Sequence, residues 1–402
     1  MRRCLMNRAH LANVSFQRAS VRPAEEEMKC CPPKLSLMRF KVKKSPWTLF
    51  LFLLITVPFL ITIFVKGTGS SNDGHEHYPW PVDVRCPDDV PHGKNHSLTG
   101  GIFFVETSER TSPNAQFMCA VESAVRAHPN TQVTIMMRGL YKQSQLKPLN
   151  LAFRLFQCFP HVDILPLDFE KLFAGTPLSS WYSAVEKHKE ATDLPILSDA
   201  SRLAILWKYG GVYLDTDFVV LKSLKNLTNS MGTQSIYTLN GAFLSFRQGH
   251  EFIELCMKDF TDSYNFWIYG HQGPQLLTRV FKRWCSVRRL RDRTSCHGVT
   301  VLPRETFYPV EWQNWRKYFE MIRPSDLNEL LRNTYAVHIW NKKSKDTRPN
   351  PGTFLDQLQS QYCPTTYSFM KTSLIISKGA QSEATFHLQL NEESTQLAKE
   401  SR

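Results

Sequence analysis

Two aspartates separated by one residue, Asp215 and Asp217, are the strongest chemical signal in the sequence. They interrupt an apolar stretch, Val212–Leu221, that otherwise favours a buried β-strand. Because side chains alternate along a strand, both carboxylates would project from one face about 7 Å apart, where like charges repel. A divalent cation removes that conflict, and hard oxygen ligands suit Mn²⁺ or Mg²⁺ bound to phosphate. The pair therefore predicts a Mn²⁺ site, with Mg²⁺ as the alternative, for a diphosphate.

The same pattern has competing interpretations. Asp-X-Asp also arises by chance in solvated turns. A glycosidase would need two carboxylates on opposite sides of the bond that it cleaves, which one strand face does not provide. The sequence contains no GxxxxGK[ST] motif, so the chemistry of a P-loop is not supported. Group transfer from a metal-bound diphosphate is therefore favoured over hydrolysis by paired carboxylates.

A helix should position the aspartates, because the residues before them carry start and stop signals. Ser198 is a good N-cap, and Gly210 and Gly211 suit the left-handed end of a helix. Within this helix Asp199 and Arg202 are three residues apart and share a face near its start. The spacing leaves two possibilities open: a surface ion pair, or a pair that hydrogen-bonds sugar hydroxyls beside the metal.

Further upstream, apolar runs alternate with helical stripes. Strands are expected at 102–105, 132–137 and 162–167, and helices at 115–128 and 149–159. This alternation predicts an α/β fold with a parallel, doubly wound sheet and right-handed crossovers. Since ligands bind beyond the carboxyl ends of strands in such sheets, the two aspartates stand where a site is expected.

The segment Trp47–Val65 holds 19 residues without a charge, nearly enough to span a bilayer as a helix. A signal peptide would be shorter and closer to the start, and a buried core helix is seldom so long without a charge. Four Lys or Arg residues lie within 39–44, whereas Lys66 alone follows closely. The positive-inside rule then predicts a type II, single-pass membrane protein with most of the chain on the luminal side.

These features divide the chain into five parts. We expect a cytosolic basic arm (1–45), a signal-anchor transmembrane helix (46–65), a luminal stem (66–98), a catalytic domain (99–366) and a flexible C-terminal tail (367–402). The arm holds 11 Lys and Arg against three Asp and Glu, so it carries +8 of the formal net charge of +13. Because this excess lies outside the catalytic domain, the composition does not support nucleic-acid binding.

Cysteine and asparagine patterns agree with an oxidising, luminal compartment. Seven cysteines follow the predicted membrane span. Since seven is odd, at least one is free or bonded to another chain, and the sequence does not reveal the pairing. Two sequons, at Asn95 and Asn226, are candidate N-glycosylation sites on the same side of the membrane. Association with a second copy or with another chain is left open.

Further ordered motifs extend the pattern around the aspartates. The central one is LSDASR…WKYGGVYLDTD, which contains both pairs described above. The others are LNGAFLSF (239–246), HQGPQLLTRVFKRWC (271–285), FYPVEWQNWRKYF (307–319), YAVHIWNKKS (335–344) and YCPTT (362–366). Together they resemble the DXD-containing alpha-1,4-glycosyltransferase family over residues 99–366. The resemblance implies a GT-A-type, Rossmann-like nucleotide-sugar-binding domain, Mn²⁺ and a UDP-sugar donor.

The resemblance also implies roles for individual residues. Asp217 would bind the metal directly, and Asp215 would contact both the metal and the donor. Asp199 and Arg202 would hold the donor sugar. Weaker donor-binding candidates lie in matching motifs: Gln272, His338, Trp340 and Asn341. Three tryptophans either stack on acceptor sugars or belong to the core: Trp267, Trp312 and Trp315.

By resemblance we expect a type II Golgi membrane enzyme that moves galactose from UDP-galactose, in alpha-1,4 linkage and with retention, onto the glycolipid lactosylceramide. Transfer of N-acetylglucosamine to O-glycans is the alternative. A catalytically inactive, membrane-anchored glycan-binding homologue is a third possibility, against which the intact Asp215/Asp217 pair argues. The residues indicate no nucleophile, and they do not decide between a protein carboxylate and same-face attack assisted by the leaving phosphate.

Overall fold

The structure is a computed structural model that describes residues 98–141, 151–159, 161–187, 194–345 and 347–371. All of these belong to the second of the chain's two units, Tyr78–Arg402. The predicted cytosolic arm, the membrane span and all of the stem except Leu98 lie outside the described ranges, as does Asn95. None of the helices within these ranges is long and apolar enough to pass through a bilayer.

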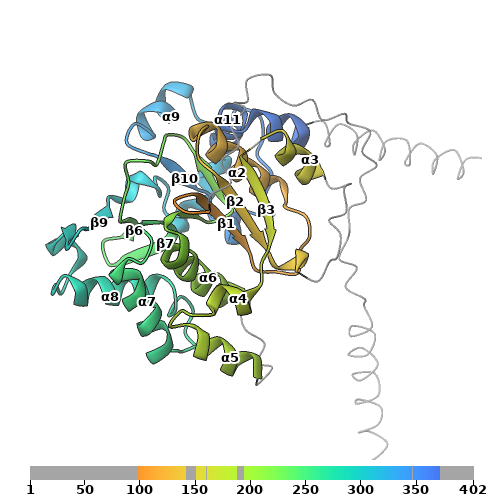
Figure 1. Ribbon diagram of the computed structural model, residues 1–402. Helices are drawn as coiled ribbons and strands as arrows, with labels where there is room; N and C mark the ends of the chain where they lie inside the picture. Colours follow the sequence, from red (N-terminus) through yellow and green to blue (C-terminus); the bar gives the residue numbers. More distant parts are fainter. Residues whose placement is uncertain (1–97, 142–150, 160, 188–193, 346, 372–402) are drawn as a thin grey trace, which may run out of the picture. The chain divides into compact units, whose positions relative to one another are not determined.

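A mixed sheet with the strand order β3-β2-β1-β4-β7-β6-β9-β8 forms the centre of the fold (Figure 1). Four neighbouring strands are parallel: β1 (Ile102–Glu106), β2 (Val133–Met137), β3 (Val162–Pro166) and β4 (Gly211–Leu214). The other half is mixed, with β6 and β9 parallel and the remaining neighbours antiparallel: β6 (Ser230–Ser235), β7 (Thr238–Phe246), β8 (Ser295–Cys296) and β9 (Val299–Leu302). The α/β class is confirmed. The expected parallel sheet stops at β4, because β7 pairs with β4 in antiparallel direction. The tight turn between β6 and β7 permits only antiparallel pairing of those two strands.

Helices cover both faces of the sheet and complete two separate cores (Figure 1). One face carries α6 (Leu194–Tyr209), α7 (Glu251–Asp262) and α8 (Pro274–Trp284), and the other carries α2 (Ala115–Ala127) and α3 (Leu151–Gln157). Successive residues of β1 point to opposite faces and pack in the two cores: Phe103 packs on the α6 side and Phe104 on the α2 side. A strand covered on both faces is expected to be apolar nearly throughout, as β1 is.

A second sheet joins β5 (Phe218–Val220) to β10 (Ala336–His338) in antiparallel register, with His338 opposite Phe218. It has its own core, built with η4 (Trp312–Phe319), α9 (Pro324–Leu330) and α11 (Phe354–Tyr362), and α10 (Asn341–Ser344) follows β10. The remaining short helices are η1 (Arg138–Leu140), α4 (Phe169–Phe173), α5 (Ser179–Lys187), η2 (Leu290–Asp292) and η3 (Arg304–Thr306). β4 and β5 are thus consecutive along the chain but belong to different sheets.

The strands and helices predicted upstream of α6 are confirmed as β1, α2, β2, α3 and β3. The predicted start of α6 is wrong: the helix already runs from Leu194, with Pro195 in the first turn, where proline is favoured. Ser198 therefore lies inside the helix and is not its cap. The predicted end is confirmed, because Gly210 adopts φ 63° and its N–H bonds to the carbonyl of Leu206.

Two disulfides are described, one between residues distant in sequence and one that closes a short loop. Cys119 in α2 is bonded to Cys363, directly after α11, and Cys285 is bonded to Cys296. Cys158 is disulfide-bonded as well. Cys256 is free and buried, and it is the one free cysteine within the part of the chain that the structure describes. The prediction of at least one unpaired cysteine is thereby confirmed.

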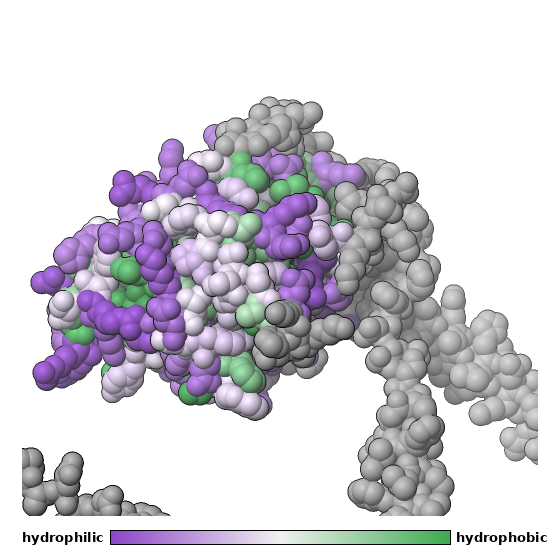
Figure 2. Space-filling view, turned by 60° about the horizontal axis from the view of Figure 1, so that its bottom comes forward, coloured by the Kyte–Doolittle hydropathy of each residue, from purple (hydrophilic) through white to green (hydrophobic). Residues whose placement is uncertain are grey.

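Positive charge gathers at one end of the main sheet. The loop closed by the Cys285–Cys296 disulfide carries four exposed arginines: Arg288, Arg289, Arg291 and Arg293. Figure 2 shows hydrophilic side chains over this end of the molecule, where β8 and β9 lie. Since β8 and β9 are the last strands of the sheet, two strands separate this charge from β4 and from the predicted site that follows it.

The packed chain continues beyond the predicted domain boundary at residue 366. Residues 364–371 are helical, and Phe369 is buried in the core that contains α2. The hydroxyl of Tyr367 donates to Oδ1 of Asp356 over 2.8 Å. The predicted flexible tail therefore begins too early, because its first five residues belong to a packed helix; residues 372–402 lie outside the described ranges.

Candidate active site

Asp215 and Asp217 lie in the turn where the chain leaves the main sheet. β4 ends at Leu214 and β5 begins at Phe218 in the second sheet, so no continuous strand carries the pair. The prediction that strand alternation aligns the two carboxylates is therefore wrong, and a turn, which aspartate favours, brings them together. Their side chains are 28% and 11% exposed, so this is not the solvated turn of the competing interpretation.

His338 completes a cluster with the two aspartates. The pairing of β10 with β5 sets His338 opposite Phe218, directly beside the turn. Its Nε2 lies 3.1 Å from Oδ1 of Asp217 and 3.8 Å from Oδ2 of Asp215. One ligand atom from each of the three residues falls within 4.8 Å of the others. Two carboxylate oxygens and an imidazole nitrogen form a ligand set that fits Mn²⁺ and related divalent cations.

Each carboxylate has one oxygen held by the protein and the other directed at His338. Oδ1 of Asp215 accepts a hydrogen bond from the hydroxyl of Tyr213 (2.8 Å) and lies 3.3 Å from Nη2 of Arg202. Oδ2 of Asp217 accepts from the backbone N–H of Asn341 (2.7 Å). The two remaining oxygens, which approach His338, are therefore oriented before any cation binds, as outer partners orient metal ligands in general.

The electrostatics of the cluster favour its charged forms. Burial alone would raise the pKa of Asp215, but Arg202 and His338 outweigh it and lower that pKa. Burial likewise tends to lower the pKa of His338, whereas the adjacent Asp217 and Asp215 carboxylates raise it to about 9. Without a metal, His338 is therefore protonated at neutral pH and partly balances the two negative charges.

Asp199 and Arg202 occupy the second and third turns of α6 and face the cluster. Nη2 of Arg202 lies 3.3 Å from Oδ1 of Asp199, the same distance as from Asp215. The Arg202 side chain is 9% exposed, and its Nε and Nη2 donate to the carbonyl and hydroxyl oxygens of Ser198. The possibility of a surface ion pair is therefore wrong. Burial tends to lower the pKa of Arg202, but the nearby Asp215 raises it, so the guanidinium stays charged.

Two buried tyrosines belong to this site and were missed in the sequence. The ring of Tyr213 lies 4.7 Å below the Arg202 guanidinium, and its hydroxyl bonds Asp215. Tyr308 packs against His338 and Trp340, with ring centroids 5.7 and 5.4 Å apart. Burial, with Asp215 nearby, raises the pKa of both tyrosines, so both remain neutral. Tyr213 could have been found, because it precedes Asp215 by two positions; Tyr308 carries no comparable local signal.

Trp340 and Asn341 act through backbone geometry and packing. Trp340 adopts the left-handed conformation (φ 54°, ψ 50°), which is unusual for a bulky residue and costs about 1 kcal/mol. This conformation turns the next N–H, that of Asn341, toward Asp217. The Trp340 ring lies 4.4 Å from His338, and its Nε1 donates to the carbonyl of Val310. Both predicted residues are therefore at the site, where Asn341 contributes its main chain.

Gln272 does not reach the cluster directly. Its side chain is buried, and its Nε2 donates to the carbonyl of Phe260 over 2.7 Å. The next residue, Gly273, makes the closer contact with the site: a Cβ added there would lie 2.7 Å from Cγ of Asp199. The absence of a side chain at Gly273 thus lets the start of α8 pack directly against the predicted donor-binding carboxylate.

The three predicted acceptor tryptophans occupy different environments. Trp267 is 82% exposed in the loop between α7 and α8. Trp312 is 42% exposed at the start of η4. Trp315 is half-buried, with its ring 5.9 Å from that of Phe319. Trp267 and Trp312 are accessible to a ligand, whereas Trp315 is largely a packing residue; acceptor stacking stays a prediction.

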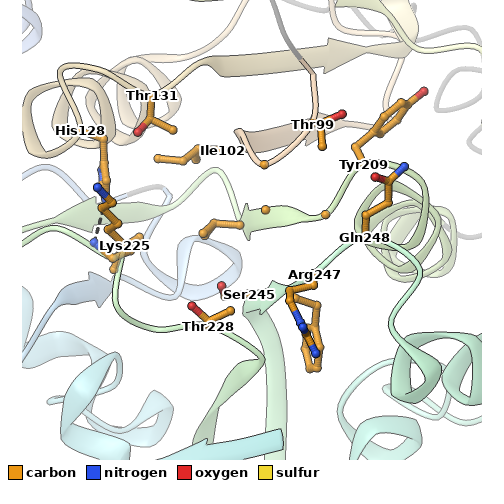
Figure 3. A pocket seen from close by; sticks show the side chains of 16 residues that line it. Thr99, Ile102, His128, Thr131, Tyr209, Lys225, Thr228, Ser245, Arg247 and Gln248 are labelled. Carbon is orange, nitrogen blue, oxygen red and sulfur yellow. Dashed lines mark hydrogen bonds between the residues drawn. The ribbon is translucent and has the colours of Figure 1, made fainter. Parts of the chain in front are cut away.

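A cavity of about 340 Å³ lies at the opposite end of the sheet (Figure 3). It is lined by residues at the amino ends of β1 and β4, among them Ile102 and Gly211, and by His128 and Lys225. Nε2 of His128 already accepts the N–H of Leu224. None of the candidate site residues predicted from the sequence lines this cavity, whereas Asp215 follows the carboxyl end of β4. The candidate site therefore lies at the other edge of the sheet.

Comparison with known families agrees with this placement. A glycosyltransferase sugar-binding region containing the DXD motif matches residues 114–237, which include Asp199, Arg202 and both aspartates of the turn. An alpha 1,4-glycosyltransferase conserved region matches residues 245–370, which include His338. The two matches meet at the cluster, because β10 from the second region pairs with β5 from the first.

Lactosylceramide 4-alpha-galactosyltransferase of Mus musculus is 52% identical over 355 residues, which cover 87% of this chain and 98% of that protein. Alpha-1,4-N-acetylglucosaminyltransferase of Homo sapiens is 34% identical over 305 residues, covering 72% and 88%. The solved structure of the galactosyltransferase LgtC with donor and acceptor sugar analogues is 14% identical with a TM-score of 0.32, covering 67% and 95%, a likeness that supports no conclusion. From the first two relatives, this chain belongs to the alpha-1,4-glycosyltransferase family.

Proposed function

We propose that this protein transfers galactose from UDP-galactose to lactosylceramide, forming an alpha-1,4 linkage with retention and using Mn²⁺. The observation that carries the proposal is the buried Asp215–Asp217–His338 cluster at the carboxyl end of β4. It occurs in a chain that is 52% identical to a lactosylceramide 4-alpha-galactosyltransferase. We assign the domain to the GT-A type, in which a nucleotide sugar lies at this edge of the sheet.

Asp215, Asp217 and His338 are the residues that would hold the cation. When bound, Mn²⁺ supplies the positive charge that stabilises the growing negative charge on a departing diphosphate. His338 must give up a proton to serve as a ligand, because its pKa of about 9 leaves it protonated at neutral pH. The two held carboxylate oxygens keep the ligand atoms in place while this exchange occurs.

Arg202 and Asp199 would position the donor sugar. Ser198 and Asp215 hold the Arg202 guanidinium in a buried position, so it needs little reorganisation when a substrate binds. Asp199 lies against Gly273 and can accept hydrogen bonds from sugar hydroxyls. Fixed donors and acceptors around the sugar lower the entropic cost of bringing the acceptor hydroxyl to the anomeric carbon.

We further propose that the protein is a Golgi membrane enzyme of type II topology with a luminal catalytic domain. The uncharged segment 46–65 and its basic flank support the topology. Disulfides at Cys119–Cys363 and Cys285–Cys296 are stable in an oxidising compartment. Asn226 is exposed, as an N-glycosylation site must be.

The test incubates the purified full chain with Mn²⁺, lactosylceramide and either UDP-galactose or UDP-N-acetylglucosamine. We expect transfer from UDP-galactose, a product whose new linkage is alpha-1,4 by NMR, and loss of product when a chelator removes the metal. Product from UDP-N-acetylglucosamine alone would instead assign the alternative donor. No product with either donor, from a chain that is folded and binds Mn²⁺, would favour a glycan-binding homologue.

A further inference from the structure

A run of four large apolar residues is exposed between α7 and α8. Phe266, Trp267, Ile268 and Tyr269 are 49%, 82%, 47% and 70% exposed, and we call residues 266–269 the aromatic loop. Isolated exposed apolar residues are ordinary, but a contiguous group of this kind marks a surface that contacts a partner. The loop therefore needs an explanation that packing within this domain does not supply.

The aromatic loop lies beside the candidate active site. The ammonium of Lys342 is 3.9 Å from the centroid of the Tyr269 ring. Lys342 directly follows Asn341, whose N–H bonds Asp217. On the other side, Nε2 of Gln275 in α8 donates to the carbonyl of Tyr269 over 3.3 Å. Both neighbours tie the loop to elements that build the site.

A pair of lysines and a second aromatic ring extend this surface. Lys342 and Lys343 are exposed, and the Lys343 ammonium is 5.9 Å from the ring of Trp312, itself 42% exposed. Neither lysine has an ion-pair partner among the residues of the described ranges. Exposed Trp and Tyr beside Lys is the composition that proteins place at a bilayer surface.

We propose that the aromatic loop, with Lys342 and Lys343, docks onto the lipid surface that carries the acceptor. The apolar side chains enter the headgroup boundary, and the ammonium groups approach lipid phosphates. Docking at this place sets the glycolipid headgroup beside the site while its hydrocarbon tails stay in the bilayer. This inference rests on the proposed function, because it assumes an acceptor held in a membrane.

A sugar-stacking platform is the competing explanation for the same rings. Such a platform needs one or two flat aromatic faces and polar groups for the hydroxyls. Ile268 has no such face, and an exposed isoleucine next to Trp267 adds hydrocarbon, which sugars do not require. The uncompensated lysines also suit anionic phosphate better than a neutral saccharide. A lipid surface accounts for all six residues, whereas a sugar accounts for some of them.

The test compares two presentations of the acceptor. The full chain and the variant Phe266→Ser/Ile268→Ser are reconstituted in phosphatidylcholine–phosphatidylserine vesicles and assayed with embedded lactosylceramide or with soluble methyl β-lactoside. We expect kcat/KM of the variant to fall about tenfold with the embedded acceptor and less than twofold with the lactoside. Met321→Ser/Leu330→Ser removes exposed apolar surface just before α9 and at its last residue, and should change neither value.

A direct measurement complements the kinetics. Brominated lipids should quench part of the tryptophan fluorescence of the full chain, and Trp267→Phe should remove a distinct part of that quenching. Equal loss of activity with both acceptors would assign the loop to sugar binding and overturn the proposal. So would unchanged kinetics together with unchanged quenching. If the parent protein transferred to neither acceptor, the proposed function would fail, and the quenching would still decide whether the loop meets lipid.

Discussion

The candidate metal cluster and the aromatic loop, which meet at Asn341 and Lys342, present opposite physical problems. At the cluster, two carboxylates and a protonated imidazole are removed from water, with Asp217 11% exposed. At the loop, apolar side chains are left in water, with Trp267 82% exposed. Each arrangement is unfavourable for an isolated protein. Each becomes favourable when its ligand is present, a cation for the first and a lipid surface for the second.

The difference also lies in how firmly each region is held. Both carboxylates that we assign to the cation are oriented by a hydrogen bond, Asp215 by Tyr213 and Asp217 by Asn341. In the aromatic loop, Tyr269 contacts Lys342 and Gln275 and the ring of Phe266 lies 6.2 Å from that of Tyr264, yet the four large side chains stay exposed. Fixed ligand atoms suit a reaction that depends on geometry, and exposed apolar side chains suit a partner as irregular as a bilayer. Substitutions at the cluster should therefore have larger effects.

The largest effect is expected at the metal site. Asp217→Ala removes a proposed ligand and leaves the Asn341 N–H without its acceptor, so kcat should fall by roughly 10³-fold or more. The folded structure should persist, because Asp217 lies in a turn at the edge of two sheets. Electron paramagnetic resonance of Mn²⁺ and a transfer assay check both statements. Asp262→Ala removes an exposed carboxylate and serves as the control; equal transfer by both variants would contradict the metal assignment.

A smaller effect is expected when Asp215 loses the hydrogen bond that orients its carboxylate. Tyr213→Phe keeps the ring under Arg202 but deletes the hydroxyl that donates to Oδ1 of Asp215. Loss of such an outer partner typically weakens metal binding about 10- to 100-fold. We expect the Mn²⁺ needed for half-maximal rate to rise by that factor, while the rate at saturating Mn²⁺ largely recovers. A rate that stays low at saturation would assign Tyr213 to the donor sugar instead.

A substitution that crowds Asp199 should weaken binding of the donor sugar nucleotide without changing the affinity for Mn²⁺. In Gly273→Ala the new methyl group meets the Asp199 carboxylate, so that side chain must move. Displacement of a positioning group by a fraction of an ångström is expected to raise the KM for UDP-galactose about tenfold. Addition of Asp199→Ala should make little further difference, since both changes disturb one interaction. Independent, multiplying effects of the two substitutions would show that Gly273 acts elsewhere.

The smallest expected effect is a change with pH in the thermal stability of the metal-free protein. The pKa of His338 is about 9 in the folded state, above its ordinary value of 6.5. The stabilisation from this proton is complete below pH 6.5 and is lost as the pH rises through 9. Mn²⁺ requires the neutral imidazole, so its affinity should rise over the same range. Thermal unfolding without metal should therefore occur a few degrees lower at pH 9 than at pH 6.5. His338→Gln should abolish that trend; its persistence would assign the trend to another group.

Much of the fold followed from local sequence patterns. The run 102–105, the helical stripe at 115–128 and the glycine pair after Tyr209 each predicted an element that the structure contains. These signals are short-range, because burial period and backbone conformation are set by residues near one another. Local patterns failed where residues close in sequence belong to different sheets. The sequence predicts β4 and β5 as one interrupted strand, but they join different sheets.

By itself, the sequence determined that Asp215 and Asp217 needed an unusual environment, because paired acids among apolar residues are stable only beside compensating charge. It also determined, through ordered motifs, the family to which the chain belongs. Only the tertiary structure decided what supplies that charge. His338 and Asn341 reach the turn through the pairing of β10 with β5, across 124 positions for Asn341 and Asp217. No local pattern encodes such a contact, since it depends on how separate cores pack.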